Sequence, residues 1–145
     1  MGRFDFQYDD ALVNQLFRLG NVDQIATQIL EETAPILERY IKAECRNHRR
    51  TGELEDSVNK SKSFKNARGY FITVRPTGYS KKYKTVNGRT GTRKEKVRNM
   101  EIMAHIEYGT SNQEATPVMT KGLKDAEPEV RAKMQEMYNR MVNGT

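Results

Sequence analysis

His105 and Glu107 are the residues whose types and spacing come nearest to catalytic chemistry. We predict a strand over residues 99–108, so these two side chains, two positions apart, would share one face. A base and an acid placed in this way could move a proton on a substrate. The nearby sequence supplies neither a nucleophile motif nor a second carboxylate at useful spacing. We therefore predict no catalytic site and expect Glu107 to hold a backbone N–H or an arginine of a neighbouring subunit.

Cys45 and His48 lie three positions apart in a predicted helix, where they could share a metal ion. Two ligands do not make a site, and a chain with 1 Cys and 2 His supplies no further cluster, so neither a metal nor a cofactor is predicted. Residues 88–91 (Gly-Arg-Thr-Gly) match the GxxG loop of KH domains, which joins two helices and clamps the phosphates of a nucleic acid. No helical apolar spacing flanks them, which makes the match weak.

Positive charge is concentrated in residues 75–98, called here the basic arm. The arm holds nine Lys or Arg residues and the single acid Glu95, so it carries +8, and the rest of a chain with net charge +6 carries −2. The nine basic residues are Arg75, Lys81, Lys82, Lys84, Arg89, Arg93, Lys94, Lys96 and Arg98. Tyr79 and Tyr83 lie among the lysines and place stacking faces beside charge, as nucleic-acid-binding surfaces do. Docking on an acidic protein surface, or plain solvation, accounts for the same composition.

The spacing of apolar residues predicts the helices. A short helix is expected over residues 9–19, inside an N-terminal arm at 1–20, and a longer one runs to about residue 47. The apolar positions of the longer helix are Ile25, Ile29, Leu30, Ile36, Leu37, Tyr40, Ile41 and Ala43. Pro35 predicts a kink or a break near residues 31–34. The last helix, over 117–142, has a sustained apolar seam at Met119, Leu123, Ala126, Val130, Met134, Met137 and Met141, and Pro128 predicts a kink or a restart in it.

Two strands are predicted over residues 58–64 and 70–75, joined by a hairpin loop at 65–69. Residues 76–98 are predicted to form a long basic loop or a protruding hairpin. With residues 99–108 as a further strand, the expected fold class is α+β: a kinked N-terminal helix, a small antiparallel sheet and a C-terminal helix packed on it, in a single domain over residues 1–145. Leu, Ile, Val and Phe supply only 28 of 145 residues, so we expect partner subunits to complete the burial.

Two short segments have the composition of joints at which the backbone must turn. The first, residues 51–58, is marked by Thr51, Gly52, Leu54 and Ser57. The second, residues 104–111 followed by 117–119, is marked by Glu107, Tyr108, Gly109, Thr110 and Pro117. Gly52 and Gly109 suit turns that require a positive φ. Both segments are therefore predicted to set geometry rather than to perform chemistry.

The two joints together resemble the gene-product-ten-like tail-component family of long-tailed bacteriophages, also called tail-completion, tail-terminator or head–tail joining proteins. The first joint is similar to the family element T-G-x-L-x-x-S-I, and the second to A-x-x-V-E-[YF]-G-T-S followed by P-F-[LM]-x-P-A. The resemblance spans residues 10–142, with Val118 in place of the family's Phe and Lys121-Gly122 in place of its Pro-Ala. The order of helix, turn, hairpin, variable insertion and C-terminal helix also matches.

The resemblance implies a structural protein of the virion, found in the host cytoplasm during assembly, without enzymatic activity. Such proteins form rings, commonly hexameric, between the head connector or stopper and the tail tube. The arm could then follow the ring, touch DNA in its lumen, or reach the tube or connector. Two alternatives stay open: a nucleic-acid-binding module that uses residues 75–98, and a small enzyme that uses His105 and Glu107. No apolar run reaches the length of a membrane span, so no membrane partner is predicted.

Overall fold

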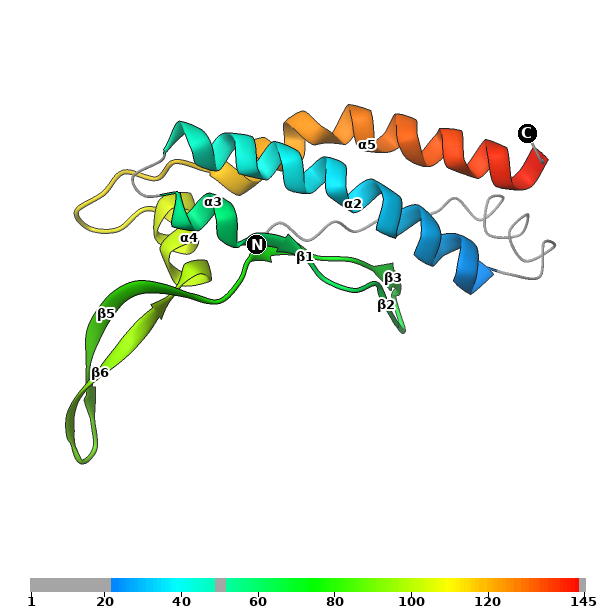
Figure 1. Cartoon of the computed structure of the whole chain (residues 1–145). Helices are drawn as coiled ribbons and strands as arrows, with labels where there is room; N and C mark the ends of the chain where they lie inside the picture. The colour runs from blue at the N-terminus through cyan, green and yellow to red at the C-terminus, as the bar shows by residue number, and fades with distance from the viewer. Residues whose placement is uncertain (1–21, 49–51, 144–145) are drawn as a thin grey trace.

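The computed structural model describes residues 22–48 and 52–143. Its helices are α2 (Val22–Asn47), α3 (Glu53–Ser57), α4 (Asn99–Tyr108) and α5 (Val118–Asn143). Its strands are β1 (Val58–Lys60), β2 (Phe64–Asn66), β3 (Gly69–Phe71), β4 (Val74–Pro76), β5 (Tyr79–Gly88) and β6 (Gly91–Arg98). The predicted α+β class is confirmed (Figure 1). The helix expected over residues 9–19 lies outside the described residues.

Helices α2 and α5 lie side by side and run in opposite directions (Figure 1). The predicted seam of α5 is confirmed, because its members are buried or half-buried against the core. The stripe predicted for α2 is confirmed except at Ala43, which is exposed. Val58, Ile72 and Val74 from the strand region belong to the same core cluster. The C-terminal helix therefore shares one hydrophobic core with α2 and the small antiparallel sheets.

A carboxylate on α5 adds polar contacts to this helix pair. Glu129 Oε1 accepts a hydrogen bond from Arg39 Nη2 at 2.6 Å, and its Oε2 accepts one from the Tyr40 hydroxyl at 2.6 Å. These two hydrogen bonds, with that of Tyr40 the stronger influence, lower the pKa of Glu129 below its ordinary value. Because Glu129 and Arg39 are largely exposed, their ion pair orients the helices more than it stabilises them.

Helix α2 continues through Pro35, so of the kink or break predicted near residues 31–34 the break does not occur. A proline has no N–H to donate to the carbonyl four residues earlier, which here belongs to Glu31. Lys60, in β1, donates from its Nζ to that carbonyl at 3.5 Å. The same Nζ donates to the Glu31 carboxylate at 2.8 Å. The Ser63 N–H donates to the same carboxylate at 3.0 Å. Hydrogen bonds from Lys60 and then Ser63 lower the pKa of Glu31, and the contact holds the strand region against α2.

Helix α5 likewise continues through Pro128, so of the kink or restart predicted there the restart does not occur. The side chain of Pro128 is exposed, on the face of α5 that points away from the core. A proline ring in such a position costs a hydrogen bond without disturbing the buried seam.

Strands β1 to β4 form one interrupted hairpin rather than the two continuous strands predicted. β1 pairs with β4 from Val58↔Pro76 to Lys60↔Val74, and β2 pairs with β3 from Phe64↔Phe71 to Asn66↔Gly69. Between the two ladders the Ser61 N–H donates to the Thr73 carbonyl at 2.7 Å. The hydroxyl of Ser61 takes the place of a backbone acceptor for the Thr73 N–H at 3.0 Å, which explains the break in the ladder.

The prediction of a strand over residues 99–108 is wrong, because this segment is helix α4. Its buried residues are Asn99, Met103 and Glu107, spaced four apart as on one side of a helix. The alternation of Ile102, Ala104 and Ile106 suggested a strand, but all three are only half-buried. Met, Glu and Ala also favour a helix intrinsically. Within the described ranges, no helix is long and apolar enough to cross a membrane.

Gly122 allows α5 to approach α2 closely. A Cβ at this position would lie 3.1 Å from both the Cα and the Cγ1 of Ile41 and 3.3 Å from its backbone nitrogen. Two of these three atoms are helix backbone and cannot rotate away. The small residue thus fixes how near the two long helices lie at the start of α5.

We predict that Gly122→Ala destabilises the protein by about 1–3 kcal/mol through overpacking. An exposed helical glycine replaced by alanine would instead gain up to about 1 kcal/mol from helix propensity. Urea unfolding followed by circular dichroism measures the difference, with Gln135→Ala on the exposed face of α5 as the control. A more stable Gly122→Ala variant would contradict the close approach.

Candidate interaction site

The second joint is built around the buried carboxylate of Glu107, which is 8 % exposed. Its Oε2 accepts a hydrogen bond from the Met119 N–H at 2.8 Å, and its Oε1 accepts one from the Thr120 N–H at 3.1 Å. The Thr120 hydroxyl also donates to Oε1. These are N–H groups of the first turn of α5, which have no partner inside the helix. Glu107 therefore caps α5 from outside, as expected for a residue that holds backbone N–H groups.

The predicted shared face of His105 and Glu107 is wrong. Two positions on a helix are separated by about 200° around its axis, because the helix has 3.6 residues per turn. His105 is accordingly exposed, whereas Glu107 faces the start of α5. In residues 22–48 and 52–143, no three His, Cys, Asp or Glu side chains are grouped to hold a metal ion. Cys45 is buried, and burial raises the pKa of its thiol to about 11, so the reactive thiolate is disfavoured.

Gly109 ends α4 in a conformation that strongly favours glycine, with φ 76° and ψ 174°. A Cβ there would lie 2.8 Å from the Ala115 nitrogen and 2.9 Å from the Gln113 oxygen. The loop that follows is closed on itself by the Thr110 N–H, which donates to the Gln113 carbonyl at 2.8 Å. The predicted turn is confirmed, while the side chains of Tyr108, Thr110 and Pro117 are exposed at the surface around it.

The first joint holds the strand that leads toward the arm. Gly52 adopts φ 83° before α3, Leu54 packs against the core, and the Ser57 hydroxyl donates to the Leu54 carbonyl at 2.7 Å. The Ser57 carbonyl accepts the Thr77 N–H at 2.8 Å and the Thr77 hydroxyl at 2.9 Å. The turn predicted at Gly52 is confirmed, while Thr51 lies outside the described residues.

Asn99, at the first position of α4, holds the two ends of the arm together. Its N–H donates to the Gly78 carbonyl at 3.1 Å, and its Nδ2 donates to the Thr77 carbonyl at 2.8 Å. Asn99 is 5 % exposed, and its Oδ1 has no hydrogen-bond partner. Sequence reasoning missed this residue, because it treated the segment as a strand. The local sequence holds no clear signal for this role, because both carbonyl acceptors of Asn99 lie far earlier in the chain.

The arm itself is a two-stranded ribbon that projects from the body (Figure 1). β5 pairs with β6 from Tyr83↔Lys96 to Gly88↔Gly91, and Arg89 and Thr90 form the turn at the tip. Residues 76–98 were predicted to form either a long loop or a protruding hairpin, and the structure has the hairpin. The GxxG match joins two strands and not two helices, so the comparison with a KH loop is wrong.

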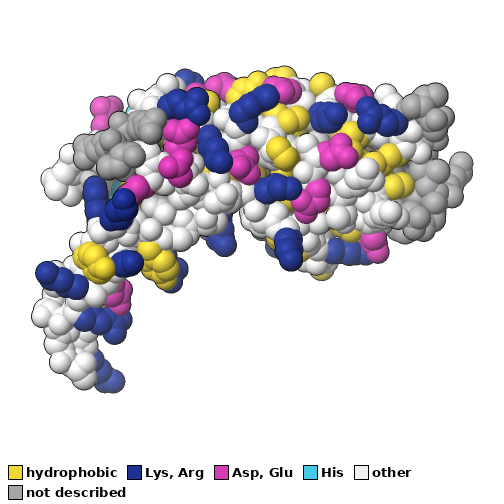
Figure 2. Space-filling view, in the orientation of Figure 1, with side chains coloured by type: hydrophobic (Ala, Val, Ile, Leu, Met, Phe, Trp, Pro, Cys, Tyr) yellow, Lys and Arg dark blue, Asp and Glu magenta, His cyan; other side chains and the backbone are white. Residues whose placement is uncertain are grey.

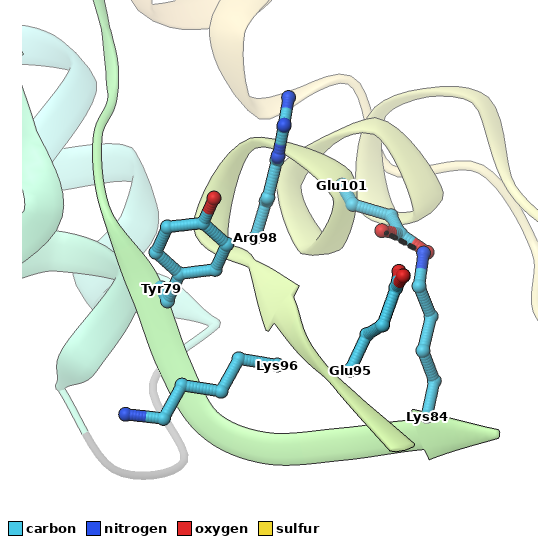
Figure 3. A pocket seen from close by; sticks show the side chains of 6 residues that line it. All are labelled: Tyr79, Lys84, Glu95, Lys96, Arg98 and Glu101. Carbon is cyan, nitrogen blue, oxygen red and sulfur yellow. Dashed lines mark hydrogen bonds and ion pairs between the residues drawn. The ribbon is translucent and has the colours of Figure 1, made fainter. Parts of the chain in front are cut away.

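The register gives the ribbon an outer and an inner face. We define the outer face as Tyr83, Thr85, Asn87, Thr92, Lys94 and Lys96, all of which are exposed. We define the inner face as Lys84, Val86, Arg93 and Glu95. Lys84 Nζ contacts the two carboxylate oxygens of Glu101 on α4 at 2.6 and 2.8 Å, and Arg93 contacts Glu95 at 2.6 Å. In Figure 3 the Lys84 amine meets Glu101 on one side of the ribbon, while Lys96 extends to the other side.

The other predicted basic residues do not join one cluster. Arg75 lies in β4 and Arg89 at the tip, and both are exposed. Lys81 lies 3.8 Å from Glu53 of α3, and Lys82 occupies an irregular stretch of β5 between Tyr79 and Tyr83. The Arg98 guanidinium lies over the Tyr79 ring, 5.9 Å from its centre. The nine positive charges are thus distributed over the whole arm rather than gathered at one point. Figure 2 shows Lys and Arg side chains along the projecting ribbon.

A hollow of about 360 Å³ lies where the ribbon meets α4 (Figure 3). It is lined by Tyr79, Lys84, Glu95, Lys96, Arg98 and Glu101. Its acids already face cations, through the Lys84–Glu101 and Arg93–Glu95 pairs. These contacts fix the direction of the ribbon, and the hollow is the joint of the arm rather than a reaction centre.

The fold and this site define an α+β protein with a two-helix layer and a projecting basic ribbon. No known family model, curated protein or solved structure matches the chain. The likeness to phage tail components is therefore a hypothesis that rests on the residues of the two joints.

We predict that Glu107→Gln lowers the free energy of unfolding by about 1–3 kcal/mol, since an amide places a donor against donor groups in a buried site. Thermal unfolding of the purified variant measures the loss. Glu114→Gln removes the same charge from an exposed loop position and serves as the control. Equal stability of the two variants would refute the claim that Glu107 stabilises the protein by capping α5.

We expect Gly109→Val to prevent correct closure of the loop before α5, because a β-branched side chain meets backbone atoms closer than 3 Å. Native mass spectrometry compares its assembly with that of the unaltered chain. Gly78→Val also replaces a glycine with positive φ, 71°, but its Cβ has nothing within 4 Å, which separates backbone strain from the clash. Normal assembly of the Gly109 variant would refute the assignment of this turn.

Proposed function

We propose that this chain is a structural subunit of the bacteriophage neck. Copies form a closed ring, hexameric by the resemblance, that completes or terminates the tail and joins it to the head connector. The observation that carries the proposal is the ribbon β5–β6, which extends away from the core that holds the rest of the chain (Figure 1). A free two-stranded ribbon is marginally stable in water. Such an arm gains stability when an assembly covers it.

The distribution of charge supports contacts of the head-to-tail kind. The arm, residues 75–98, carries +8, while residues 22–48, 52–74 and 99–143 contain 12 Lys or Arg and 15 Asp or Glu, a net charge of −3. One end of the subunit is therefore strongly basic and the remainder mildly acidic. Opposite charges on two different surfaces favour a contact in which the arm of one copy lies against the body of the next. Heterologous contacts of this kind close into rings when the rotation between copies allows it.

The use of the two joints supports a structural role over an enzymatic one. Glu107 and Gly109, which carry the resemblance, are engaged in capping α5 and in turning the chain. His105, the nearest candidate base, is exposed on another side of α4. Both joints also hold elements at the base of the arm, so their residues set its direction. A virion subunit that must present an arm at a fixed angle has a use for such joints.

The test is the oligomeric state of the purified chain, alone and mixed with its tail-tube and connector proteins, measured by native mass spectrometry and negative-stain electron microscopy. The unaltered chain is expected to form one closed ring that binds the end of the tube or the connector. A shortened arm, with residues 85–94 replaced by Asn-Gly, keeps the Lys84↔Glu95 pair beside a two-residue turn. We expect this variant to fold, as judged by circular dichroism, and to lose the ring.

A chain that stays monomeric at high concentration and binds neither partner would overturn the proposal. Rings that persist in the shortened variant would show that the arm does not make the contact between subunits, and would refute the head-to-tail arrangement.

A further inference from the structure

The outer face of the ribbon is exposed along its length, and of its six residues only Lys96 also lines the hollow at the base of the arm. Tyr83 is 60 % exposed, and the hydroxyls of Thr85 and Thr92 and the amide of Asn87 lie along the same face as Lys94 and Lys96. The face contains no acid. Among the described residues, neither Lys94 nor Lys96 has an ion-pair partner, in contrast to Lys84 and Arg93 on the inner face.

We propose that the outer face binds the phosphate backbone of duplex DNA, with the ribbon lying in the major groove. The groove admits a two-stranded β-ribbon. Lysine ammonium groups pair with phosphates, and threonine hydroxyls and asparagine amides donate hydrogen bonds to phosphate oxygens. The stretch from Tyr83 to Gly88 spans about 20 Å at 3.3 Å per residue, so its lysines and hydroxyls meet several successive phosphates. Arg89 at the tip extends the same positive surface.

The inner face explains why the outer one is turned toward DNA. Glu95 and Glu101 lie on the inner side, where they would repel phosphate, and Lys84 ties that side to α4 (Figure 3). With the inner face held in this way, the cationic face points away from the body. The acids of the arm base thus orient the ribbon, and of the outer-face residues only Lys96 lines the hollow with them.

A second copy of this chain is a poorer occupant of the outer face. In the head-to-tail contact the described body of the next copy, with a net charge of −3, offsets less than half of the +8 on the arm, and two outer faces repel each other. Lysines along a ribbon also discourage pairing with another strand. A polyanion from outside the assembly supplies the negative charge that balances the basic arm.

Single-stranded nucleic acid fits the outer face less well than a duplex does. Binding of unpaired bases uses several aromatic side chains on which successive bases stack. The outer face has only Tyr83, since the irregular stretch of β5 separates it from Tyr79. The Tyr79 ring already carries the Arg98 guanidinium. The observations therefore favour a duplex held by its phosphates, without sequence specificity.

The test measures binding of a short fluorescent DNA duplex by anisotropy over a series of salt concentrations. The variant Lys94→Gln/Lys96→Gln removes two outer-face charges. Its control, Lys62→Gln/Arg68→Gln, removes the same charge from exposed positions of the β2–β3 hairpin region. The slope of log K against log salt is expected to fall in magnitude by about 2 per bound arm in the outer-face variant and to stay unchanged in the control. Native mass spectrometry of all three proteins reports the ring separately.

Weaker DNA binding with the smaller salt slope and intact rings in the outer-face variant supports the inference. Equal salt slopes for the two double variants would overturn it, because the affinity for DNA would then depend on net charge and not on the outer face. Preference for a single strand of the same length, or rings that break in the outer-face variant, would also overturn it. Rings without any DNA binding would refute this inference and leave the proposed function standing.

Discussion

The buried carboxylate of Glu107 is the contact on which the arrangement of the arm depends. It fixes the end of α4 to the start of α5, whose seam lies in the core with α2. The other end of α4 begins at Asn99, which holds the residues that enter the ribbon, and Glu101 between them holds Lys84. One helix of ten residues thus connects the hydrophobic core to the ribbon at three polar points. The cap therefore acts together with Met103, which is buried in the core cluster, to hold α4 and the ribbon in place.

The protein divides its apolar and polar contacts unequally. The helix pair α2–α5 holds most of the buried hydrophobic side chains, and Gly122 brings the two helices close enough for their side chains to interlock. The strand region is attached to α2 both by apolar contacts and by the Glu31–Lys60–Ser63 hydrogen bonds. The ribbon β5–β6 contributes no side chain to the core cluster. Hydrophobic burial therefore stabilises the body, while polar contacts set the position of the arm.

Periodicity found the long helices because their buried residues repeat in a pattern that only a helix satisfies. The seam from Met119 to Met141 extends over many turns, so a single exception such as Pro128 does not hide it. The segment at α4 is short, and its half-buried Ile102, Ala104 and Ile106 gave a false alternation. Its most informative residues, Asn99 and Glu107, are buried polar side chains, whose environment depends on chain segments far away in the sequence.

The residue types and turns of the site could be predicted from the sequence, but the relative positions of its side chains could not. The charge of the arm and the turns at Gly52 and Gly109 followed from residue types alone. The separation of Lys84 from Lys96 onto opposite faces depends on strand register, and composition does not reveal register. The role of Gly122 depends on how near α2 lies, which only the folded chain determines. Sequence thus indicated which segments matter, while tertiary contacts decided which side chains meet.

The polar attachment of the ribbon makes it a lever. Its ten-residue strand β5 is about 33 Å long at 3.3 Å per residue. A rotation of about 10° at the α4 contact therefore displaces the tip by about 6 Å and leaves the core cluster, to which the ribbon contributes no side chain, intact. A rigid apolar attachment would resist such a rotation. In the ring proposed above, such rotations would let the arms follow a change in the diameter of the channel while each core stays unaltered.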